Sequence, residues 1–523
     1  MQIVKKFRLI TLLMLLFAAK LQAQENVLYY MYDVPQTLLL NPANKYNCRG
    51  FIELPVLSKV YLGIHNTGFG YNTIFTVDPV TGKTTIDLDK MYNNMPKTNF
   101  LRTEFNTNLI GFGFQVKKMY FTFNINNHTD FKFGLPRDIL ALTKGNYQDG
   151  EVIEEINLSN LGVDLLNYTA ISASVSRNFY ENWRFGVRVK YILGHVNLNT
   201  KKSVTKWITD ENLDFLRFEA EIQLNSALLL ANTGDSGFNS IGINENLLDD
   251  LLGTLNQNRG FGLDLGAIYN YDEKIKLNAS ITDLGMIMWK ASITQFNAKG
   301  EFTWTGLELS DTTNFDQIFT DLTDSLSNAY TFSPTDVSKY ALSLPTKIYL
   351  GATYQLHEKV LLGVVNKTMF LKNRPHTSLS FSANLKPLKF LTTTFTYAMM
   401  DNTYNNLGFG LVIGNRGAQF YIATDKVPIN FATIDGIPVP YSARTFDIQF
   451  GLNIIFGCKQ KVKEIEAMSC PQHRVWNKDV FQRQSRFELR EFIEKQKSKK
   501  VFFYKEKEPK YKKKKKKKKR KKR

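Results

Sequence analysis

The feature that most constrains this chain is a two-residue alternation of side-chain character along its apolar segments. The clearest segment is Trp183–Tyr191, where every odd position is aromatic or aliphatic and every even position is basic or glycine. Successive side chains of a β-strand point to opposite faces, so this pattern predicts a strand with one apolar and one polar face. The same alternation recurs in Phe121–Asn126, Ile348–Leu356, Leu407–Ile413 and Phe446–Phe456.

The spacing of these segments predicts how the strands pair. Phe261–Tyr271 and Lys274–Leu284 flank Asp272-Glu273, which predicts a tight hairpin. A soluble sandwich also alternates, but strands of about nine to eleven residues with aromatic apolar faces are typical of membrane barrels. The chain holds 39 Phe and 24 Tyr against 15 Pro. We predict an all-β fold: a transmembrane antiparallel β-barrel of about fourteen strands, with short helical insertions and a basic C-terminal tail.

The first 23 residues have the pattern of a secretory signal. Three basic residues precede the apolar run Leu9–Ala19, and the small residue Ala23 stands before Gln24, where we expect cleavage. An N-terminal anchor helix is the alternative, but the run is shorter than the roughly 20 residues that a span needs. No later apolar run reaches about 18 residues, which excludes a helical membrane protein. An exported chain of this kind is either soluble or a β-barrel.

The sequence pattern of two segments between strands predicts that they form helices. Leu135–Gly145 has Pro136 at its start and glycine at its end, and Asn244–Leu255 has apolar residues at helical spacing. We interpret both as insertions that cap or plug the barrel mouth, with ordinary surface helices as the alternative. The last strand ends in Phe456, where outer-membrane barrels carry an assembly signal; a strand that simply ends in Phe is the alternative.

The net charge of +19 belongs entirely to the C-terminal tail. Residues 457–523 hold 27 Lys and Arg and 8 Asp and Glu, which is +19, and the remainder holds 67 − 27 = 40 basic and 48 − 8 = 40 acidic residues. We divide the chain into a signal peptide (1–23), an outer-membrane barrel (24–456), a periplasmic tail with an amphipathic helix over Lys478–Lys499 (457–511) and a disordered polybasic terminus (512–523). The terminus consists of Lys512, Lys513, Lys514, Lys515, Lys516, Lys517, Lys518, Lys519, Arg520, Lys521, Lys522 and Arg523.

The position of this charge limits its partners. A run of like charges stays extended and attracts anions. We expect a barrel in the outer membrane of a Gram-negative bacterium, surrounded by outer-membrane lipid, with both termini in the periplasm, where nucleic acid is absent. The tail then meets anionic lipid, the cell-wall polymer or an acidic periplasmic protein. A charged extension without function is the alternative.

Two groups of side chains are candidates for a site. Arg184, Arg188 and Lys190 lie on the polar face of the clearest strand, where they either bind an anion inside a pore or are matched by acidic neighbours.

The second group is the three cysteines, Cys48, Cys458 and Cys470. Three are too few for a disulfide-dense scaffold. Cys48 stands just before the first strand and Cys458 just after the last, and these ends are neighbours in a closed barrel. Cys48–Cys458 pairing, Cys458–Cys470 pairing and three free thiols all stay open.

Catalytic and cofactor patterns are absent from the sequence. Gly82-Lys83-Thr84 resembles the end of a phosphate-binding loop, but Val77 occupies the position that requires glycine. The six histidines have no metal-ligand spacing, and no nucleophile elbow is present. We therefore predict no catalytic residues, no metal, no cofactor and no enzymatic activity.

A set of short motifs resembles a known family. The motifs are Tyr29–Gln36, Asn41-Pro42-Ala43, Leu135–Asp138 with Gly145-Asn146, Gly262–Ala267, Thr282–Gly285 and Leu344–Gly351. Together they resemble the outer-membrane barrels of the domain of unknown function DUF5723, which is similar in outline to fatty-acid-transporter-like barrels and to barrel components of type IX secretion. The resemblance covers roughly Gln24 to Phe456 and implies an outer-membrane barrel of about fourteen strands without an established activity. The tail departs from that pattern.

Three functions fit these features. The first is a channel or a transport or translocation component for a small or apolar substrate. The second is a membrane anchor or accessory of a type IX-like secretion system, whose basic tail docks periplasmic partners. The third is a soluble secreted β-protein with a polyanion-binding tail.

Overall fold

The computed structural model describes most of the chain between Val27 and Cys458. The described residues are 27–44, 46–68, 70, 74–77, 84–144, 147–148, 151–152, 155–212, 215–233, 241–254, 257–304, 330–335, 339–371, 374–400, 403–427, 431–434, 437–440 and 445–458. The chain divides into residues 1–459 and 460–523, and the second unit lies outside the described residues.

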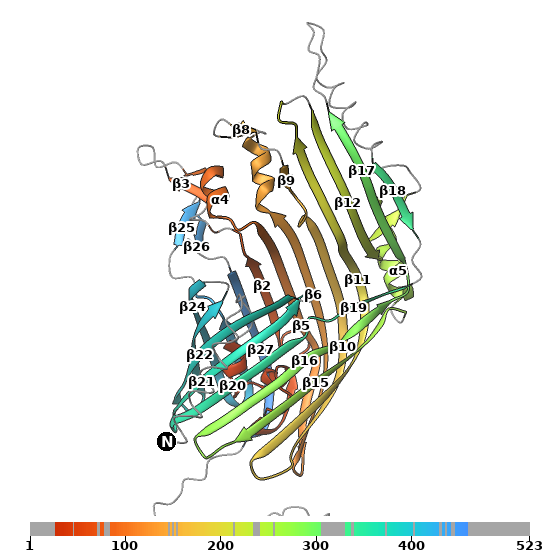
Figure 1. Cartoon of the computed structure of the whole chain (residues 1–523). Helices are drawn as coiled ribbons and strands as arrows, with labels where there is room; N and C mark the ends of the chain where they lie inside the picture. The colour runs from red at the N-terminus through yellow and green to blue at the C-terminus, as the bar shows by residue number, and fades with distance from the viewer. Residues whose placement is uncertain are drawn as a thin grey trace, which may run out of the picture. The chain divides into compact units, whose positions relative to one another are not determined.

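The first unit is a closed antiparallel barrel of fourteen strands (Figure 1), as the alternating segments predicted. Several wall strands are interrupted along their length, and β24 counts twice because its first half pairs with β23 and its second half with β27. In chain order the wall consists of β1 (Cys48–Glu53) continued by β2 (Val60–Asn66), β5 (Thr98–Val116), β6 (Met119–Pro136), β10 (Gly162–Asn178), β11 (Trp183–Thr209), β12 (Leu216–Ala227) continued by β15 (Arg259–Asn270), β16 (Ile275–Trp289) continued by β17 (Ile293–Trp304), β18 (Tyr330–Thr335) and β19 (Tyr340–Ser343) continued by β20 (Lys347–His357), β21 (Val360–Leu371), β22 (Arg374–Leu388), β23 (Leu391–Met400), both halves of β24 (Thr403–Thr424) and β27 (Thr445–Cys458).

Short elements complete the described part of the chain. The helices are α2 (Val27–Tyr30), η1 (Pro35–Leu39), α4 (Leu88–Asn94), η2 (Arg137–Lys144) and α5 (Leu247–Thr254). The remaining strands are β3 (Phe75–Val77), β4 (Thr84–Ile86), β7 (Tyr147–Gln148), β8 (Glu151–Val152), β9 (Glu155–Asn157), β13 (Leu230–Asn232), β14 (Ile241–Ile243), β25 (Phe431–Ile434) and β26 (Ile437–Pro440). None of the helices in the described residues is long and apolar enough to cross a membrane.

The two faces of the wall strands differ as the alternation requires. Along residues 172–176 of β10 and 183–189 of β11, the side chains that point inward are buried, and those that point outward are exposed and apolar. The outward set on the wall includes Ile110, Phe112, Phe114, Val175, Phe185, Val187, Val189, Leu265, Leu277, Leu350, Leu362, Phe381, Phe395, Leu407, Ile413, Phe446, Ile454 and Phe456. A closed wall pairs its backbone groups internally, which is what hydrocarbon demands. This belt of exposed apolar side chains counts against the soluble secreted form.

The wall is taller on one side, where β11 has 27 residues while β15 and β21 have 12 each. β11 pairs with β15 along its first half and with β12 along its second. We call residues 197–227 together with β17 the upper wall, and the ring at the level of β15 the lower barrel. Figure 1 shows β12 and β17 rising above the lower barrel. Where strand β12 gives way to β15, the Asn258 side chain accepts hydrogen bonds from the backbone N–H groups of Lys290 and Ala291.

At the other end of the barrel the strands are joined by short reversals, and we call this the turn end. The reversals are residues 117–118, 179–182, 271–274, 358–359, 389–390 and 414–417. The expected hairpin across Asp272-Glu273 is one of them. At the same end β1 pairs with β27, and a disulfide joins Cys48 to Cys458 across this seam between the first and last wall strands.

The two expected helices differ from their predicted form. β6 pairs with β5 up to Pro136, opposite Thr98, so only Arg137–Lys144 is helical, as a 3-10 turn. The other helix is α5, which begins three residues after the expected start. Both lie away from the turn end (Figure 1), and the lumen is filled instead by the N-terminal segment described below. The expected cleavage point, the amphipathic tail helix, Cys470 and the polybasic terminus lie outside the described residues.

Candidate functional site: the plugged lumen

The lumen of the lower barrel contains the segment Val27–Asn44, which we call the plug. Nearly all of its side chains are buried, and Val27, Leu28 and Tyr29 have no exposed surface. Figure 1 shows the plug inside the ring of strands near the turn end. Its only regular elements are the single turn α2 and the 3-10 turn η1. The sequence did not predict this segment as a plug, because it carries neither an alternation nor a helical period.

The first part of the plug packs against the wall through apolar and aromatic side chains. Tyr29 stacks on Tyr349 of β20, with ring centroids 5.2 Å apart and planes 14° from parallel. The Tyr30 hydroxyl donates a hydrogen bond to the backbone oxygen of Ser380 at 2.7 Å. The buried cluster consists of Val27, Leu28, Tyr29, Tyr30, Met31, Val34, Leu40, Tyr349, Val365, Val412, Tyr421 and Ala423. Burial of a large apolar side chain contributes about 1.5–3 kcal/mol, so this half of the plug is held mainly by the hydrophobic effect.

The second part of the plug is held by polar contacts. Gln36 Nε2 donates to Glu53 Oε1 at 3.0 Å and to Asn453 Oδ1 at 2.6 Å, and Asn453 Nδ2 donates back to Gln36 Oε1 at 3.0 Å. Asn108 and Asn124 donate to the other oxygen of Glu53. All of these groups are buried. A buried amide and carboxylate are stable only when such partners are present, so these contacts fix the position of the plug.

Two arginines of β11 bind plug carbonyl groups directly. Arg188 Nη1 donates to the Leu39 oxygen at 3.0 Å and Nη2 to the Leu38 oxygen at 2.5 Å. Arg184 Nε donates to the Ala43 oxygen at 2.9 Å. These carbonyl groups have no regular ladder partner, since the plug is irregular, and the guanidinium groups supply the donors that a buried backbone needs.

Glycines let the wall approach the plug closely. A Cβ atom on Gly186 would lie 2.3 Å from the Pro42 carbonyl carbon, and one on Gly266 would lie 2.2 Å from Asn41 Oδ1. Both glycines face each other across the β11–β15 pair. No side chain fits at either position while Asn41-Pro42-Ala43 stays in place.

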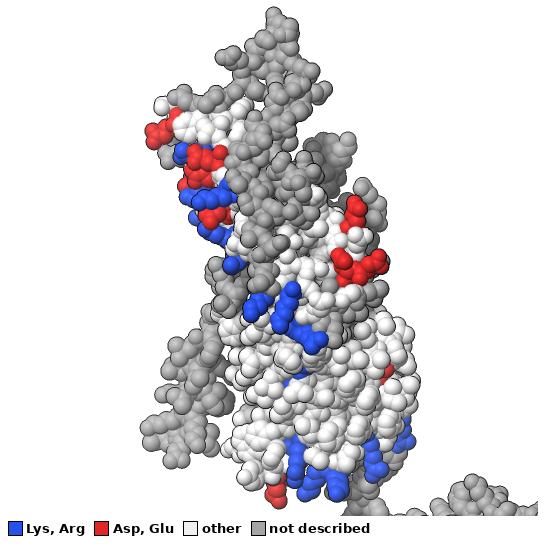
Figure 2. All heavy atoms as spheres, turned by 90° about the vertical axis from the view of Figure 1, so that its right-hand side faces the viewer, with Lys and Arg blue, Asp and Glu red and all other residues white. Residues whose placement is uncertain are grey.

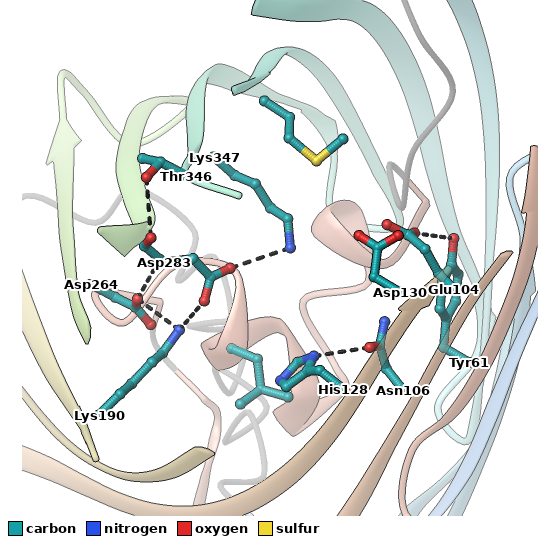
Figure 3. Close-up of polar contacts among 12 residues, drawn as sticks. Tyr61, Glu104, Asn106, His128, Asp130, Lys190, Asp264, Asp283, Thr346 and Lys347 are labelled. Atoms are coloured by element: carbon teal, nitrogen blue, oxygen red, sulfur yellow. Dashed lines mark hydrogen bonds and ion pairs between the residues drawn. The ribbon is translucent and has the colours of Figure 1, made fainter. Parts of the chain in front are cut away.

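A network of alternating charges spans four wall strands, β11, β15, β16 and β20, beside the plug. Arg188 pairs with Asp264 at 2.9 Å, and Lys190 pairs with Asp264 at 2.8 Å and with Asp283 at 2.5 Å. Lys347 of β20 is the last member of this network, with its Nζ atom 3.3 Å from Asp283 Oδ2 (Figure 3). Arg188 and Asp264 are 1% and 0% exposed, so both charges are withdrawn from water and each depends on the other.

A second charged group lies across the lumen on β2, β5 and β6 (Figure 3). Arg102 forms hydrogen bonds to both carboxylate oxygens of Asp130, at 2.9 and 2.6 Å, and also pairs with Glu104. His65 lies 3.7 Å from Glu104. His128 is hydrogen bonded to Asn106 at 2.9 Å.

Apolar side chains occupy the adjoining part of the lumen. The ring of Tyr168 stacks on His128, with centroids 4.9 Å apart. Tyr168 belongs to a buried cluster that also contains Leu166, Ala170, Ile192, Ala227, Ile287, Trp289 and Leu344. This part of the lumen therefore contains packed apolar side chains next to charged groups that have partners.

The three basic residues singled out in the sequence all face the lumen. Each has protein partners: plug carbonyl groups for Arg184 and Arg188, and carboxylates for Arg188 and Lys190. This is the matched arrangement that stood beside anion binding as an alternative, and anion binding by these residues stays a prediction.

Further residues of the site were not predicted from the sequence, among them Gln36, Glu53, Asp264 and Asp283. A signal for Asp264 existed, since it lies on the polar face of an alternating strand. Among the described residues no three His, Cys, Asp or Glu side chains gather as a metal site.

Several solved structures resemble this chain in outline. The toluene transporter TodX of P. putida is 10% identical, covers 80% of this chain and 94% of its own length, and gives a TM-score of 0.36. The Ralstonia pickettii toluene transporter TbuX is 8% identical, covers 81% and 94%, and gives 0.38. A Pseudomonas aeruginosa FadL homologue is 12% identical, covers 84% and 100%, and gives 0.35. Similarity at this level does not extend the substrates of those proteins to this chain.

No relative is found among curated protein sequences. The sequence motifs had indicated one family, and the match to that family spans residues 42–425, well over half of the chain. It begins at Pro42 of the plug and extends to the end of the wall strand β24. The chain belongs to the family of unknown function DUF5723.

Proposed function

We propose that this protein is an outer-membrane channel or transport component for a small or apolar substrate, and that the plug closes its lumen. The observation that carries the proposal is the plug itself: Val27–Asn44 is buried inside the barrel, with aromatic packing at one end and hydrogen bonds at the other. A solute crosses such a lumen only when the plug moves. The buried apolar cluster around Tyr168 and Trp289 gives this part of the lumen the apolar character that suits an apolar solute.

In such a channel we expect the turn end to lie in the periplasm. Outer-membrane barrels have short periplasmic turns and longer extracellular loops, and the reversals at the turn end are short. The end of β27 lies at this end, so the tail that follows Cys458 would face the periplasm. Proteinase treatment of intact cells tests this: cleavage in the tail only after the outer membrane is opened supports it, and cleavage of intact cells contradicts it.

The function is tested by loosening the plug without stranding a charge. The double variant R188M/D264L removes both members of a buried pair, and with them the two hydrogen bonds to the plug carbonyls of Leu38 and Leu39. In planar bilayers we expect the wild-type protein to conduct rarely and the variant to open often. Vesicles that contain the variant should also take up more of an apolar dye than vesicles that contain the wild type.

The matched control is K202M/E221L, which removes an ion pair on the upper wall, far from the plug. This variant should conduct like the wild type. Equal conductance of the wild type, R188M/D264L and the control would contradict a channel closed by the plug.

The anchor hypothesis is tested separately with a chain that ends at Cys458. This chain retains every wall strand and the Cys48–Cys458 disulfide. Unchanged conductance together with loss of co-purifying periplasmic proteins would favour docking through the tail. Unchanged co-purification would leave the channel as the function.

A further inference from the structure

Basic side chains surround the barrel at the turn end. Each of the six reversals has an exposed Lys or Arg within it or within two residues of it, and Arg49 adds another beside the disulfide. We call this set the basic ring: Arg49, Lys117, Lys118, Arg177, Lys274, Lys276, Lys359, Lys389 and Arg416. Figure 2 shows basic side chains gathered along the lower margin of the face in view.

The ring carries an excess of positive charge. Among the residues that the structure describes, its nine basic residues stand against four exposed acidic residues at the same end, Glu181, Asp272, Glu273 and Glu358, which leaves +5. The Asp272 carboxylate is further engaged by the backbone N–H groups of Lys274 and Ile275. On the upper wall the basic residues Lys202 and Arg217 form ion pairs with Glu221 and Glu301.

Exposed aromatic side chains fix the height of the ring relative to a membrane. Phe179 is 64% exposed, Tyr180 75%, Tyr271 64% and Phe390 52%, and all four lie in or beside the reversals. Aromatic side chains in such a girdle lie at the membrane–water interface. A residue one or two positions from them along a strand lies about 3–7 Å away, which is the level of lipid phosphate groups. The Arg177 guanidinium is within 5.9 Å of the Phe179 ring centroid, so the two features are adjacent.

We propose that the basic ring binds the headgroups of anionic phospholipids in the leaflet at the turn end. The observations that favour lipid over a protein partner are the distribution of charge over all six reversals and its position at the level of the exposed aromatic side chains. A protein would need a patch on one side, whereas a leaflet contacts the barrel on every side. The ring is distinct from the polybasic tail and from the lumen, so this proposal does not depend on the channel function.

Spin-labelled lipids test the proposal on the full-length protein in phosphatidylcholine vesicles. The measured quantity is the association of spin-labelled phosphatidylglycerol with the barrel relative to spin-labelled phosphatidylcholine, from the motionally restricted fraction. We expect the wild type to prefer phosphatidylglycerol. The variant K118Q/K274Q/K359Q should reduce this preference by about fivefold, and added salt should reduce the wild-type preference.

Two further variants separate the ring from other sources of charge. K97Q/K201Q/K299Q removes the same charge from exposed positions away from the turn end and should keep the preference. Deletion of residues 512–523 should also keep it. The proposal is overturned if the wild type shows no preference, if both triple variants lose it equally, or if only the tail deletion does. Folding of every variant is verified by its heat-dependent mobility in gels.

Discussion

The lower barrel and the upper wall use the same strand, β11, in opposite ways. In the lower barrel β11 provides Arg188, which is 1% exposed and pairs with the fully buried Asp264. Farther along, in the upper wall, it provides Lys202, which is 48% exposed and pairs with the 45% exposed Glu221. Both pairs connect β11 to its neighbouring strand on the same side.

The difference shows what each pair does for the protein. A buried pair stabilises little in itself, but loss of one partner is costly, so it fixes what lies next to it, here the plug. An exposed pair gains little energy in water and is screened by salt. The lower barrel should therefore be rigid and specific, and the upper wall tolerant of change.

The largest expected effect comes from leaving a buried charge without its partner. Asp264→Ala removes the carboxylate that both Arg188 and Lys190 contact, and it should lower the free energy of unfolding by about 3–5 kcal/mol. Urea titration of the barrel refolded in lipid vesicles measures this. Glu221→Ala is the matched change on the upper wall and should cause no measurable loss. Equal losses would remove the contrast between the two regions.

The next effect concerns the seam of the lower barrel. Cys48→Ser together with Cys458→Ser removes the disulfide between β1 and β27 and should lower the free energy of unfolding by about 2–4 kcal/mol. The thermal transition of the folded band in gels measures it. Cys470→Ser is the control for loss of a thiol and should have no effect. An equal shift with that control would mean that the seam disulfide is not the stabilising bond.

A smaller effect is expected from added volume beside the plug. Gly186→Ala places a methyl group where the Pro42 carbonyl lies, so the plug must shift, at a cost of about 1–3 kcal/mol. Gly253→Ala, in α5 outside the barrel wall, has no neighbour within 4 Å and should stabilise its helix. Urea titration compares the two. An equal loss of unfolding free energy in both variants would contradict the close fit between the plug and Gly186.

The smallest effect lies in the loops beyond the barrel, at the N-terminus of α4. The Asp87 side chain accepts hydrogen bonds from the Lys90 backbone N–H at 2.8 Å and from the Thr76 hydroxyl at 3.0 Å, which lower its pKa below the usual value. A lowered folded-state pKa stabilises the helix above the unfolded pKa of about 3.9, and this contribution is lost as the pH falls through the folded value. Asp87→Ala should speed amide exchange in Leu88–Asn94 at neutral pH and leave the lower barrel unchanged. Exchange in both segments checks this, and faster exchange throughout would contradict a local cap.

The wall of the barrel was predictable because its signal is local. Alternation over Trp183–Tyr191 needs only neighbouring residues, and it suffices to place Arg184, Arg188 and Lys190 together on the polar face that lines the lumen. The bounds of the helix after Leu135 were less accurate, since pairing of Pro136 with Thr98 extends β6 into a segment whose own sequence favours a helix.

Most contacts of the candidate site could not be predicted from the sequence. Gln36 meets Asn453 across 417 residues, Arg188 meets Leu38 across 150, and Tyr30 meets Ser380 across 350. No periodic pattern links positions so far apart. The pairing of Cys48 with Cys458 was one of three open alternatives, and the antiparallel register of β1 and β27 brings these two cysteines together.

The sequence by itself determined that the strands have one face for lipid and one for the lumen, because that property depends only on which residue types alternate. The tertiary structure alone decided that an irregular N-terminal segment occupies the lumen and which charges it satisfies. The physical reason is that a buried polar group is stable only beside its partner, and closure of the barrel, rather than any local pattern, determines which partner it meets.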